Sequence, residues 1–226
     1  MLLFFVFMLS VAATPADLDR DGLKDSFEQE LLVRFLPAFQ VHRNDCDGLP
    51  AEFAQGEISP KSLARNGTIY GRVVTKTTGK NARIAIQYFH LWNRDCGIFP
   101  HRLDVEHVTA VVTAKDLKQA AKKWKAVSWY AGAHEDTLCD NSGSIEAVAL
   151  QAETRGPKVW ISKGKHASYL DLERCARGCR TDNCRDAQPM PVSRIVNLGE
   201  PAHPLNGSLF IHSRRWRFHD KLNEAP

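Results

Sequence analysis

Short runs rich in β-branched and aromatic residues, separated by turn residues, dominate the chain and most constrain its fold. The clearest run is VEHVTAVVT at 105–113, and the runs IYGRVVT at 69–75 and RIAIQYFHLW at 83–92 flank turn residues at 78–81. Further runs lie at 126–133, 145–151, 158–162 and 193–199. Many short strands with turn signals between them favour a β-sandwich or barrel over alternating βαβ units. The sequence therefore predicts a mainly β fold, a β-sandwich of short antiparallel strands with a few helices and a disulfide-pinned loop.

Two segments are predicted to be helical. EQELLVRFLPAF at 28–39 is typical of a helix that ends at Pro37, because proline cannot continue a helix. The second helix is predicted near 115–125, where three lysines recur at helical spacing and would form a solvated face: Lys118, Lys122 and Lys125.

The first residues predict export from the cytoplasm. Met1 to Val11 is an apolar run of the length of a signal-peptide core, and small residues follow at 12–16, so we predict a signal peptide at 1–16, cut after Ala13 or Ala16. A membrane anchor is the alternative, but a spanning helix needs about 20 apolar residues. The chain is therefore expected to be secreted or periplasmic, with a calcium loop and helix at 17–40 and a single β-sandwich domain at 41–226.

The cysteines agree with that destination. An even number of cysteines in an exported protein indicates a disulfide framework, and six are present: Cys46, Cys96, Cys139, Cys175, Cys179 and Cys184. The last three share one polar segment, so at least one bridge is expected to pin it. A zinc site is the alternative, although the spacing lacks the paired C-x2-C ligands of a strong zinc signature.

An acidic segment at 17–28, DLDRDGLKDSFE, has the ligand spacing of an EF-hand-type calcium loop. Gly22 stands at the position of the sharp turn, and the predicted Ca²⁺ ligands are Asp17, Asp19, Asp21, the carbonyl of Leu23, Asp25 and Glu28. Five carboxylates converge in a short loop only if a cation cancels their repulsion. A solitary loop resembles those of dockerin and thrombospondin type-3 repeats, which implies structural calcium. The alternative is an acidic helix start without metal.

A second acidic site is predicted in PHRLDVEHV at 100–108. In a strand, Asp104 and Glu106 would share one face with the apolar residues that follow at every second position. Burying two carboxylates is costly, so a bound cation, or His101 and Arg102 folded over them, would have to offset the cost. Histidine with carboxylate oxygens suits Mg²⁺, Mn²⁺ or Ca²⁺. The alternative is an ordinary salt-bridge network at a strand end, with His107 on the opposite face.

The same segment resembles a known family. His101-Arg102-x-Asp104-x-Glu106 is similar to the GHRHDWE heptapeptide of the necrosis- and ethylene-inducing-like proteins, and IAIQYFHLWNRDCG resembles the strand before it. LLVRFLPAFQVHRND, HRLDVEHV and VWISKGKHASYL resemble the related vacuolar-protein-sorting-associated domain family. The resemblance implies a β-sandwich with a divalent cation, which in the necrosis-inducing branch helps binding to plant membrane sphingolipid glycans and subsequent cytolysis.

Carried over residue by residue, the resemblance implies these ligands for the second cation: Asp95, His101, Asp104 and Glu106. The heptapeptide also departs from the family at three positions, which puts toxin activity in doubt: Pro100, Leu103 and Val105. His166 and Ser168 match a motif of the vacuolar-sorting branch to which we assign no role. A turn with a satisfied histidine at 164–168 is the favoured interpretation.

Three functions are compatible with these features. The first is a non-enzymatic binding protein whose cation site contacts membrane head groups or glycans. The second is a metal-dependent hydrolase of phosphodiesters or esters, in which His101 or His107 acts as general base near a cation held by Asp104 and Glu106, and His134 and His166 complete the site. The third is a domain with calcium only as a structural staple. Nucleic acid is not expected, because 30 Lys and Arg against 26 Asp and Glu is only mildly basic.

Overall fold

The computed structural model describes residues 16–76 and 81–223, so the predicted signal peptide lies, except for Ala16, outside the described residues. The strands are β1 (Ala38–His42), β2 (Ala51–Phe53), β3 (Ser62–Arg65), β4 (Ile69–Thr75), β5 (Ala82–Asp95), β6 (His101–Ala114), β7 (Lys125–Ala131), β8 (Gly143–Glu146), β9 (Lys158–Ile161), β10 (Ser168–Tyr169), β11 (Ala187–Pro189), β12 (Ile195–Asn197), β13 (Gly199–Glu200) and β14 (His203–Pro204). The helices are α1 (Asp25–Arg34), α2 (Leu172–Ala176) and α3 (Asp220–Asn223), with 3₁₀ turns η1 (Ala121–Lys123) and η2 (Leu209–His212). The prediction of a mainly β chain with a few helices is confirmed.

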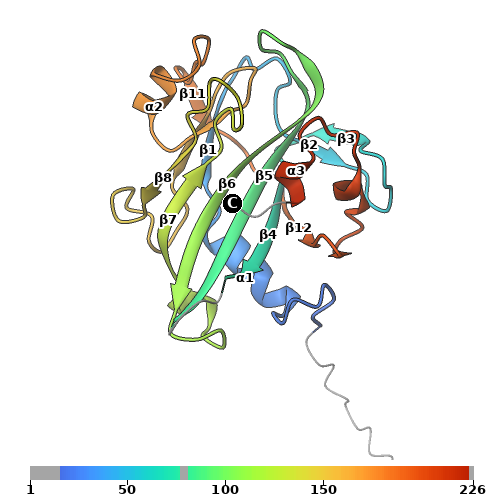
Figure 1. Cartoon of the computed structure of the whole chain (residues 1–226), viewed down its shortest axis with the longest axis vertical. Coiled ribbons are helices and arrows are strands. Elements are labelled where there is room, and N and C mark those ends of the chain that lie inside the picture. Colours follow the sequence, from blue (N-terminus) through green and yellow to red (C-terminus); the bar gives the residue numbers. More distant parts are fainter. Residues whose placement is uncertain (1–15, 77–80, 224–226) are drawn as a thin grey trace, which may run out of the picture.

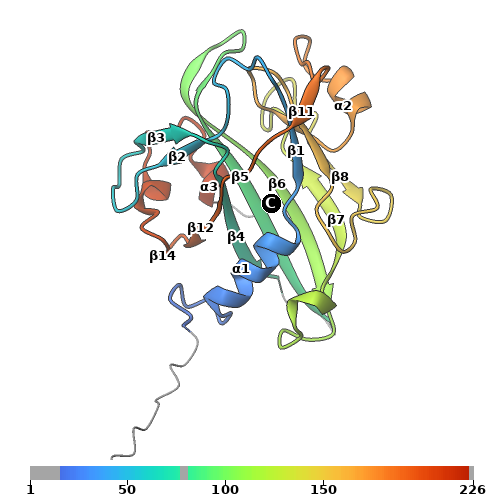
Figure 2. The same ribbon diagram turned by 180° about the vertical axis from the view of Figure 1, so that it is seen from behind.

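A six-stranded sheet in the order β12-β4-β5-β6-β7-β8 forms the centre of the molecule. One face is covered by α1 and by a four-stranded sheet in the order β10-β9-β1-β11, whereas β2, β3 and the C-terminal segment lie over the other face (Figures 1 and 2). Two apolar cores result. Ile86 and Val108 pack with Leu31 of α1 in the first core, and Phe89 packs with Trp216 in the second.

The hairpin of β5 and β6 positions the residues discussed below. Its ladder runs from the Ala82–Ala114 pair to the Asp95–His101 pair. β7 pairs with β6 only from Val108 onward. The part of β6 that carries the predicted second site therefore has a strand partner on one side only, and the space that β7 leaves there is open to other segments.

Helix α1 forms where the sequence predicts it, with acidic residues in its first turn and Arg34 in its last, as the helix dipole favours. It ends shortly before Pro37, as expected. Leu32 is fully buried against the sheet, and its carbonyl accepts a hydrogen bond of 3.0 Å from the hydroxyl of Tyr88. A Cβ atom on Gly71 would lie 2.2 Å from a Leu32 methyl group. Glycine in β4 thus permits the helix to approach the sheet this closely.

The structure differs from several sequence predictions in detail. The segment near 115–125 is a loop with one 3₁₀ turn, so Lys118, Lys122 and Lys125 do not form a helix face. Asp116 accepts a hydrogen bond from the Lys118 amide at 2.9 Å, and the indole of Trp124 donates to the Gln119 carbonyl at 3.1 Å. These local bonds satisfy the backbone of a connection that must reverse from β6 into β7.

The predicted strand at 145–151 is shorter than expected, because β8 ends at Glu146 and turns follow it. The strands are also not all short or all antiparallel. β5 and β6 each have 14 residues, and two pairings are parallel, β1 with β9 and β12 with β4. Strand β1 lies partly in the segment assigned to the N-terminal helix, since it begins directly after Pro37.

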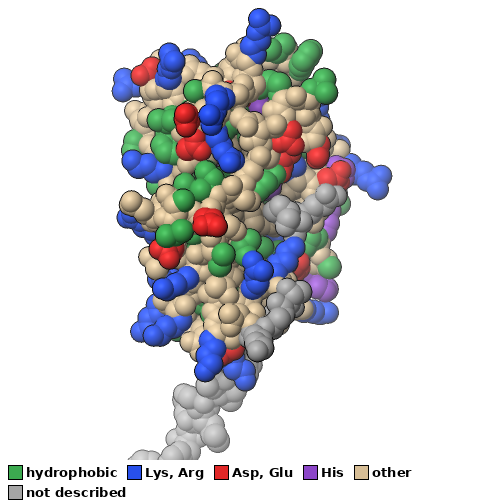
Figure 3. Space-filling view, turned by 60° about the vertical axis from the view of Figure 1, so that its left-hand side comes forward, with side chains coloured by type: hydrophobic (Ala, Val, Ile, Leu, Met, Phe, Trp, Pro, Cys, Tyr) green, Lys and Arg blue, Asp and Glu red, His purple; other side chains and the backbone are tan. Residues whose placement is uncertain are grey.

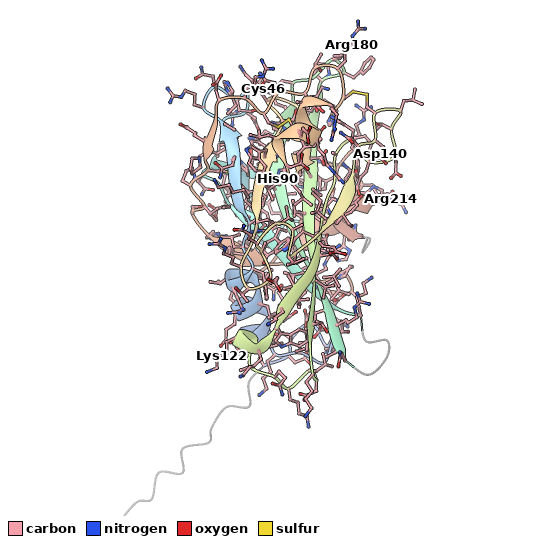
Figure 4. All side chains as sticks on the ribbon, turned by 90° about the vertical axis from the view of Figure 1, so that its left-hand side faces the viewer. Cys46, His90, Lys122, Asp140, Arg180 and Arg214 are labelled. Carbon is pink, nitrogen blue, oxygen red and sulfur yellow. A yellow bond between two sulfur atoms is a disulfide. The ribbon has the colours of Figure 1, made fainter. Side chains whose placement is uncertain are left out.

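All six cysteines are paired, which confirms the disulfide framework and makes the zinc alternative wrong. The bridges are Cys46–Cys96, Cys139–Cys179 and Cys175–Cys184. The last one pins the polar loop as predicted. Figure 4 shows S–S bonds at the end of the molecule near Cys46 and Arg180, opposite Lys122. Three disulfides indicate an oxidising, extracytoplasmic environment. Over the described part of the chain, no helix is long and apolar enough to span a membrane.

Candidate functional site

A pocket of about 420 Å³ lies at the end of the β5–β6 hairpin, where β7 has diverged from β6. Three segments wall it: the hairpin loop at 95–101, the loop after β7 at 134–139, and the C-terminal residues 217–221. Asp104 and Glu106 also line it. We call it the apical pocket. Its volume is in the range of sites that hold a small ligand.

The mouth of the apical pocket carries exposed apolar side chains. Ile98 and Phe99 of the hairpin loop are 63% and 80% exposed, and Leu138 of the facing loop is fully exposed. We call these three residues the apolar rim. The space-filling view shows hydrophobic side chains next to acidic and basic ones toward the upper end of the molecule (Figure 3). Large apolar side chains grouped in water are uncommon outside interaction surfaces.

Glu106 pairs with a lysine from the C-terminal helix. The Nζ atom of Lys221 lies 3.1 Å from Glu106 Oε1 and 3.5 Å from the Val105 carbonyl oxygen, at the open side of β6. Burial raises the pKa of Glu106 to about 8, and the Lys221 ammonium opposes that shift. Burial also acts to lower the pKa of Lys221, but the carboxylates of Glu106, Asp104 and Glu135 outweigh it and raise the pKa. Lys221 is therefore a built-in cation of the pocket.

Asp104 is held by a second built-in cation. Nδ1 of His166 lies 2.9 Å from Asp104 Oδ2, and its Nε2 lies 3.2 Å from Asp45 Oδ1. The imidazole stacks on Trp92 with ring centroids 3.8 Å apart. Burial opposes protonation, but the hydrogen bonds to the two carboxylates outweigh it and raise the pKa of His166 to about 9. Conversely, His166 overcomes burial and holds the pKa of Asp104 below its usual value.

The four predicted ligands of the second cation line the same pocket but do not converge. Asp95 Oδ1 accepts from the Gly97 amide at 2.5 Å, and the His101 ring lies edge-on to Phe218. Among the described residues, the donor atoms of Asp95, His101, Asp104 and Glu106 are not gathered within 4.8 Å of one another. Both carboxylates on β6 already have a cationic partner, so this set, as arranged, does not fit a divalent ion. The second cation stays a prediction.

The remaining histidines have partners of their own. His107 lies 2.7 Å from Glu135, and its ring is near Phe89, on the face opposite Asp104 as predicted. Burial raises the pKa of Glu135, but the bonds from His107 and Tyr130 outweigh it and lower the pKa to about 2. His134 bonds Asp182, which also accepts from three other side chains: Ser162, Lys165 and Tyr169. His166 has both nitrogens occupied. Of the four candidate catalytic histidines, His101 is the one without a hydrogen-bonding partner among the described residues. Its Nδ1 is buried and unpaired, as is the Nδ1 of His107.

Sequence reasoning missed Lys221, Glu135, Asp182 and Asp45. Each meets a predicted site residue across a long stretch of chain; Lys221 and Glu106 are 115 residues apart and His166 and Asp45 are 121 apart. No spacing rule relates such positions. The only available signal was the cost of leaving Asp104 and Glu106 buried without partners, which required some cation without naming it.

The predicted calcium loop lies at the other end of the molecule, beside α1 (Figure 1). Its carboxylates form two groups whose oxygens lie within 4.8 Å of one another, Asp17 with Asp19 and Asp25, and Asp19 with Asp21 and Glu28. Leu23 is buried in the first core. The five predicted acidic ligands are therefore brought together, with Asp19 shared by both groups.

No family model matches this sequence, and no curated protein matches it. Solved structures with a similar fold are necrosis- and ethylene-inducing proteins. NLPPya in complex with mannosamine is 16% identical, with a TM-score of 0.47 over 84% of this chain and 81% of that one. Necrosis and Ethylene inducing Protein 2 from the causal agent of cocoa's Witches Broom disease is 17% identical, with a TM-score of 0.47 over 93% and 95%.

Proposed function

We propose that this chain is an extracellular, non-enzymatic protein that binds the sugar head group of a membrane glycolipid in the apical pocket. The observation that carries the proposal is the combination of a charged pocket with an exposed apolar rim at its mouth. A sugar offers hydroxyl groups that bond both to carboxylates and to ammonium groups. The apolar rim would meet the lipid surface from which the sugar projects.

The charges of the pocket suit a polyhydroxylated ligand. Glu106 and Lys221 supply an acceptor and a donor at the floor, and Lys165 and Arg217 add further donors along the wall. Glu106 Oε2 is buried without a hydrogen-bond partner in the described structure. A ligand hydroxyl would satisfy that oxygen, whose isolation is otherwise costly.

Cation dependence, predicted from the sequence, is not part of this proposal. Lys221 and His166 already neutralise Glu106 and Asp104. An added ion would have to displace Lys221 or bind Asp95 and His101 alone. We therefore expect sugar binding to persist in the presence of a chelator. The hydrolase alternative would use His101, which lines the pocket and has no hydrogen-bonding partner among the described residues, or His134, which lines it and is oriented by Asp182.

The test uses the full chain in two assays. Calorimetric titration with glucosamine and mannosamine measures the pocket; these sugars are chosen because NLPPya has been solved with each. Flotation with vesicles, with or without a glycosphingolipid, measures membrane attachment. Binding is expected only to the vesicles with the glycolipid. Absence of binding both to the sugars and to glycolipid vesicles would overturn the proposal, as would turnover of a phosphodiester or ester lost in His101→Ala.

Variants separate the pocket from its rim. Phe99→Ser with Leu138→Ser is expected to weaken vesicle binding at least about tenfold, because burying one large apolar side chain is worth about 1.5–3 kcal/mol. Its affinity for free sugar should stay within about twofold. Ile58→Ser is the matched control, since Ile58 is 67% exposed and does not line the pocket. Equal losses in the control and the rim variant would refute the role of the rim.

A further inference from the structure

We propose that residues 17–28 bind one Ca²⁺ ion, and that the ion fastens the N-terminal loop and α1 to the β12–β13 segment near the other end of the chain. The spacing of the acids was visible in the sequence. The structure adds two observations. Buried carboxylate oxygens of the loop have no hydrogen-bond partner, and residues from β12 and β13 lie close to these carboxylates. The inference does not depend on the apical pocket.

The first observation is a set of buried carboxylate oxygens that nothing in the described structure satisfies. Asp19 is 1% exposed and both of its oxygens lack a hydrogen-bond partner. Glu28 is fully buried, and its Oε1 is also without a partner, as is Asp21 Oδ2. Asp19 belongs to both groups of converging acids, so its unsatisfied oxygens lie between the other carboxylates. A buried charge without a partner is rare because its desolvation is not offset.

Basic residues do not fill this gap. Among residues 16–76 and 81–223, no ion pair within 4.0 Å joins a lysine or arginine to the carboxylates of the loop, although ion pairs of this kind occur elsewhere in the chain. Arg20 and Lys24 of the loop itself are exposed. The acids are therefore left to repel one another unless a cation from solution joins them.

The backbone of the loop is folded so that its carboxylates point inward. Gly22 has a φ of 91° at the sharp turn. The amides of Gly22, Leu23 and Leu18 each donate to one carboxylate oxygen, of Asp17, Asp21 and Asp25 respectively. These bonds fix the outer side of the ring of acids. An oxygen-only cage of this kind suits Ca²⁺, which takes six to eight oxygens in flexible geometry, better than Mg²⁺, which demands a near-ideal octahedron.

The second observation extends the site to a distant part of the sequence. The side-chain amide of Asn197 in β12 donates to Glu28 Oε2 at 3.1 Å, across 169 residues. It orients Glu28 with its free Oε1 available as a ligand. Glu200 of β13 is another acid close enough to act electrostatically on Asp19. An ion held by Asp19 and Glu28 would therefore tie residues 17–28 to residues 197–200, a link that spacing within 17–28 could not predict.

The experiment measures thermal unfolding of the full chain in calcium, magnesium and chelator. Calcium at one hundred times its dissociation constant is expected to raise the Tm of the wild type by about 5–10 °C for a domain of this size. Magnesium should have a much smaller effect. A Tm that does not differ between calcium and chelator would overturn the proposal.

The variants Asp19→Asn and Glu28→Gln should differ from the wild type in opposite directions in the two conditions, with a Tm that is equal or higher in chelator and lower in calcium. In chelator each variant should melt at the same temperature as the wild type or higher, because it removes one charge from a repelling cluster. In calcium each should melt below the wild type and lose most of the calcium shift. A purely structural role would lower the Tm in both conditions and would contradict the proposal. Glu57→Gln, an exposed acid outside the loop, should behave as the wild type in both.

Hydrogen exchange tests the connection to the second half of the chain. Calcium should slow amide exchange at least about tenfold both at 17–28 and at 195–200. Protection confined to 17–28 would refute the fastening of β12 and β13.

Discussion

Replacing Lys221 with methionine tests the built-in cation of the apical pocket. Methionine keeps the unbranched shape of the lysine side chain but lacks the ammonium group, which lies 3.1 Å from Glu106 Oε1. The pair is largely buried, since the side chain of Lys221 is 11% exposed and that of Glu106 is 6% exposed. At an effective dielectric constant of about 20, two unit charges at that distance attract by about 5 kcal/mol. Breaking a buried pair by removing one partner costs about 3–5 kcal/mol, because the other charge is left unpaired. We expect Lys221→Met to lower the free energy of unfolding by that amount.

The assay is urea unfolding at pH 9, above the Glu106 pKa of about 8 and below the Lys221 pKa, which is raised from 10.5, so that both groups are charged. Unfolding is followed by the fluorescence of the buried tryptophans for the wild type, Lys221→Met, Glu106→Gln and the double variant. The double variant should cost at least about 2 kcal/mol less than the sum of the single variants, since it leaves no buried charge alone. A divalent cation should stabilise Lys221→Met more than the wild type, because Glu106 is then free to bind it. The reasoning is refuted if Lys221→Met costs less than about 1 kcal/mol or if the two single effects add.

Three further outcomes are expected. The hydrogen-bonding partners of Asp182 outweigh its burial and lower its pKa from 3.8 to about 2. The ionised carboxylate therefore stabilises the fold by about 2 kcal/mol above pH 4, and this contribution disappears as the pH falls toward 2. Acid unfolding of Asp182→Asn should lack this pH-dependent step. Replacing both Cys46 and Cys96 by serine opens a loop of 50 residues and should cost about 4 kcal/mol, seen as a lower Tm. Leu32→Ala leaves a cavity between α1 and the sheet and should cost about 2–5 kcal/mol in urea unfolding.

Local patterns predicted the central part of the fold. The β-branched runs at 69–75, 83–92 and 105–113 became β4, β5 and β6, and the helix before Pro37 became α1. β4, β5 and β6 are buried on both faces over most of their length, an environment that β-branched and aromatic residues favour, so composition and structure agree. The segment near 115–125 failed because lysine spacing reports only that a surface is solvated, which holds for a loop as well as for a helix.

The sequence predicted the acidic residues of the site but not the basic residues that pair with them. Alternation along β6 correctly put Asp104 and Glu106 on the face opposite His107. The groups that neutralise them come from 166 and 221, and strand periodicity says nothing about segments so distant in the sequence. The family resemblance supplied a divalent cation for the same charges, whereas the structure supplies a lysine and a protonated histidine. The electrostatic requirement was thus foreseeable, and its solution was not.

The short strands β11 and β12 determine when this chain can finish folding. β11 pairs with the outer side of β1, and β12 with the outer side of β4, so residues 187–197 cap both sheets at once. A ribosome must release residues 187–189 before β1 is covered and residues 195–197 before β4 is covered. Until then, the backbone groups of β1 and β4 can pair with strands of other chains. Each capping strand has only three residues, so the finished protein presents little edge for such pairing. Premature termination upstream of residue 187 would therefore leave β1 and β4 uncovered and yield self-associating fragments.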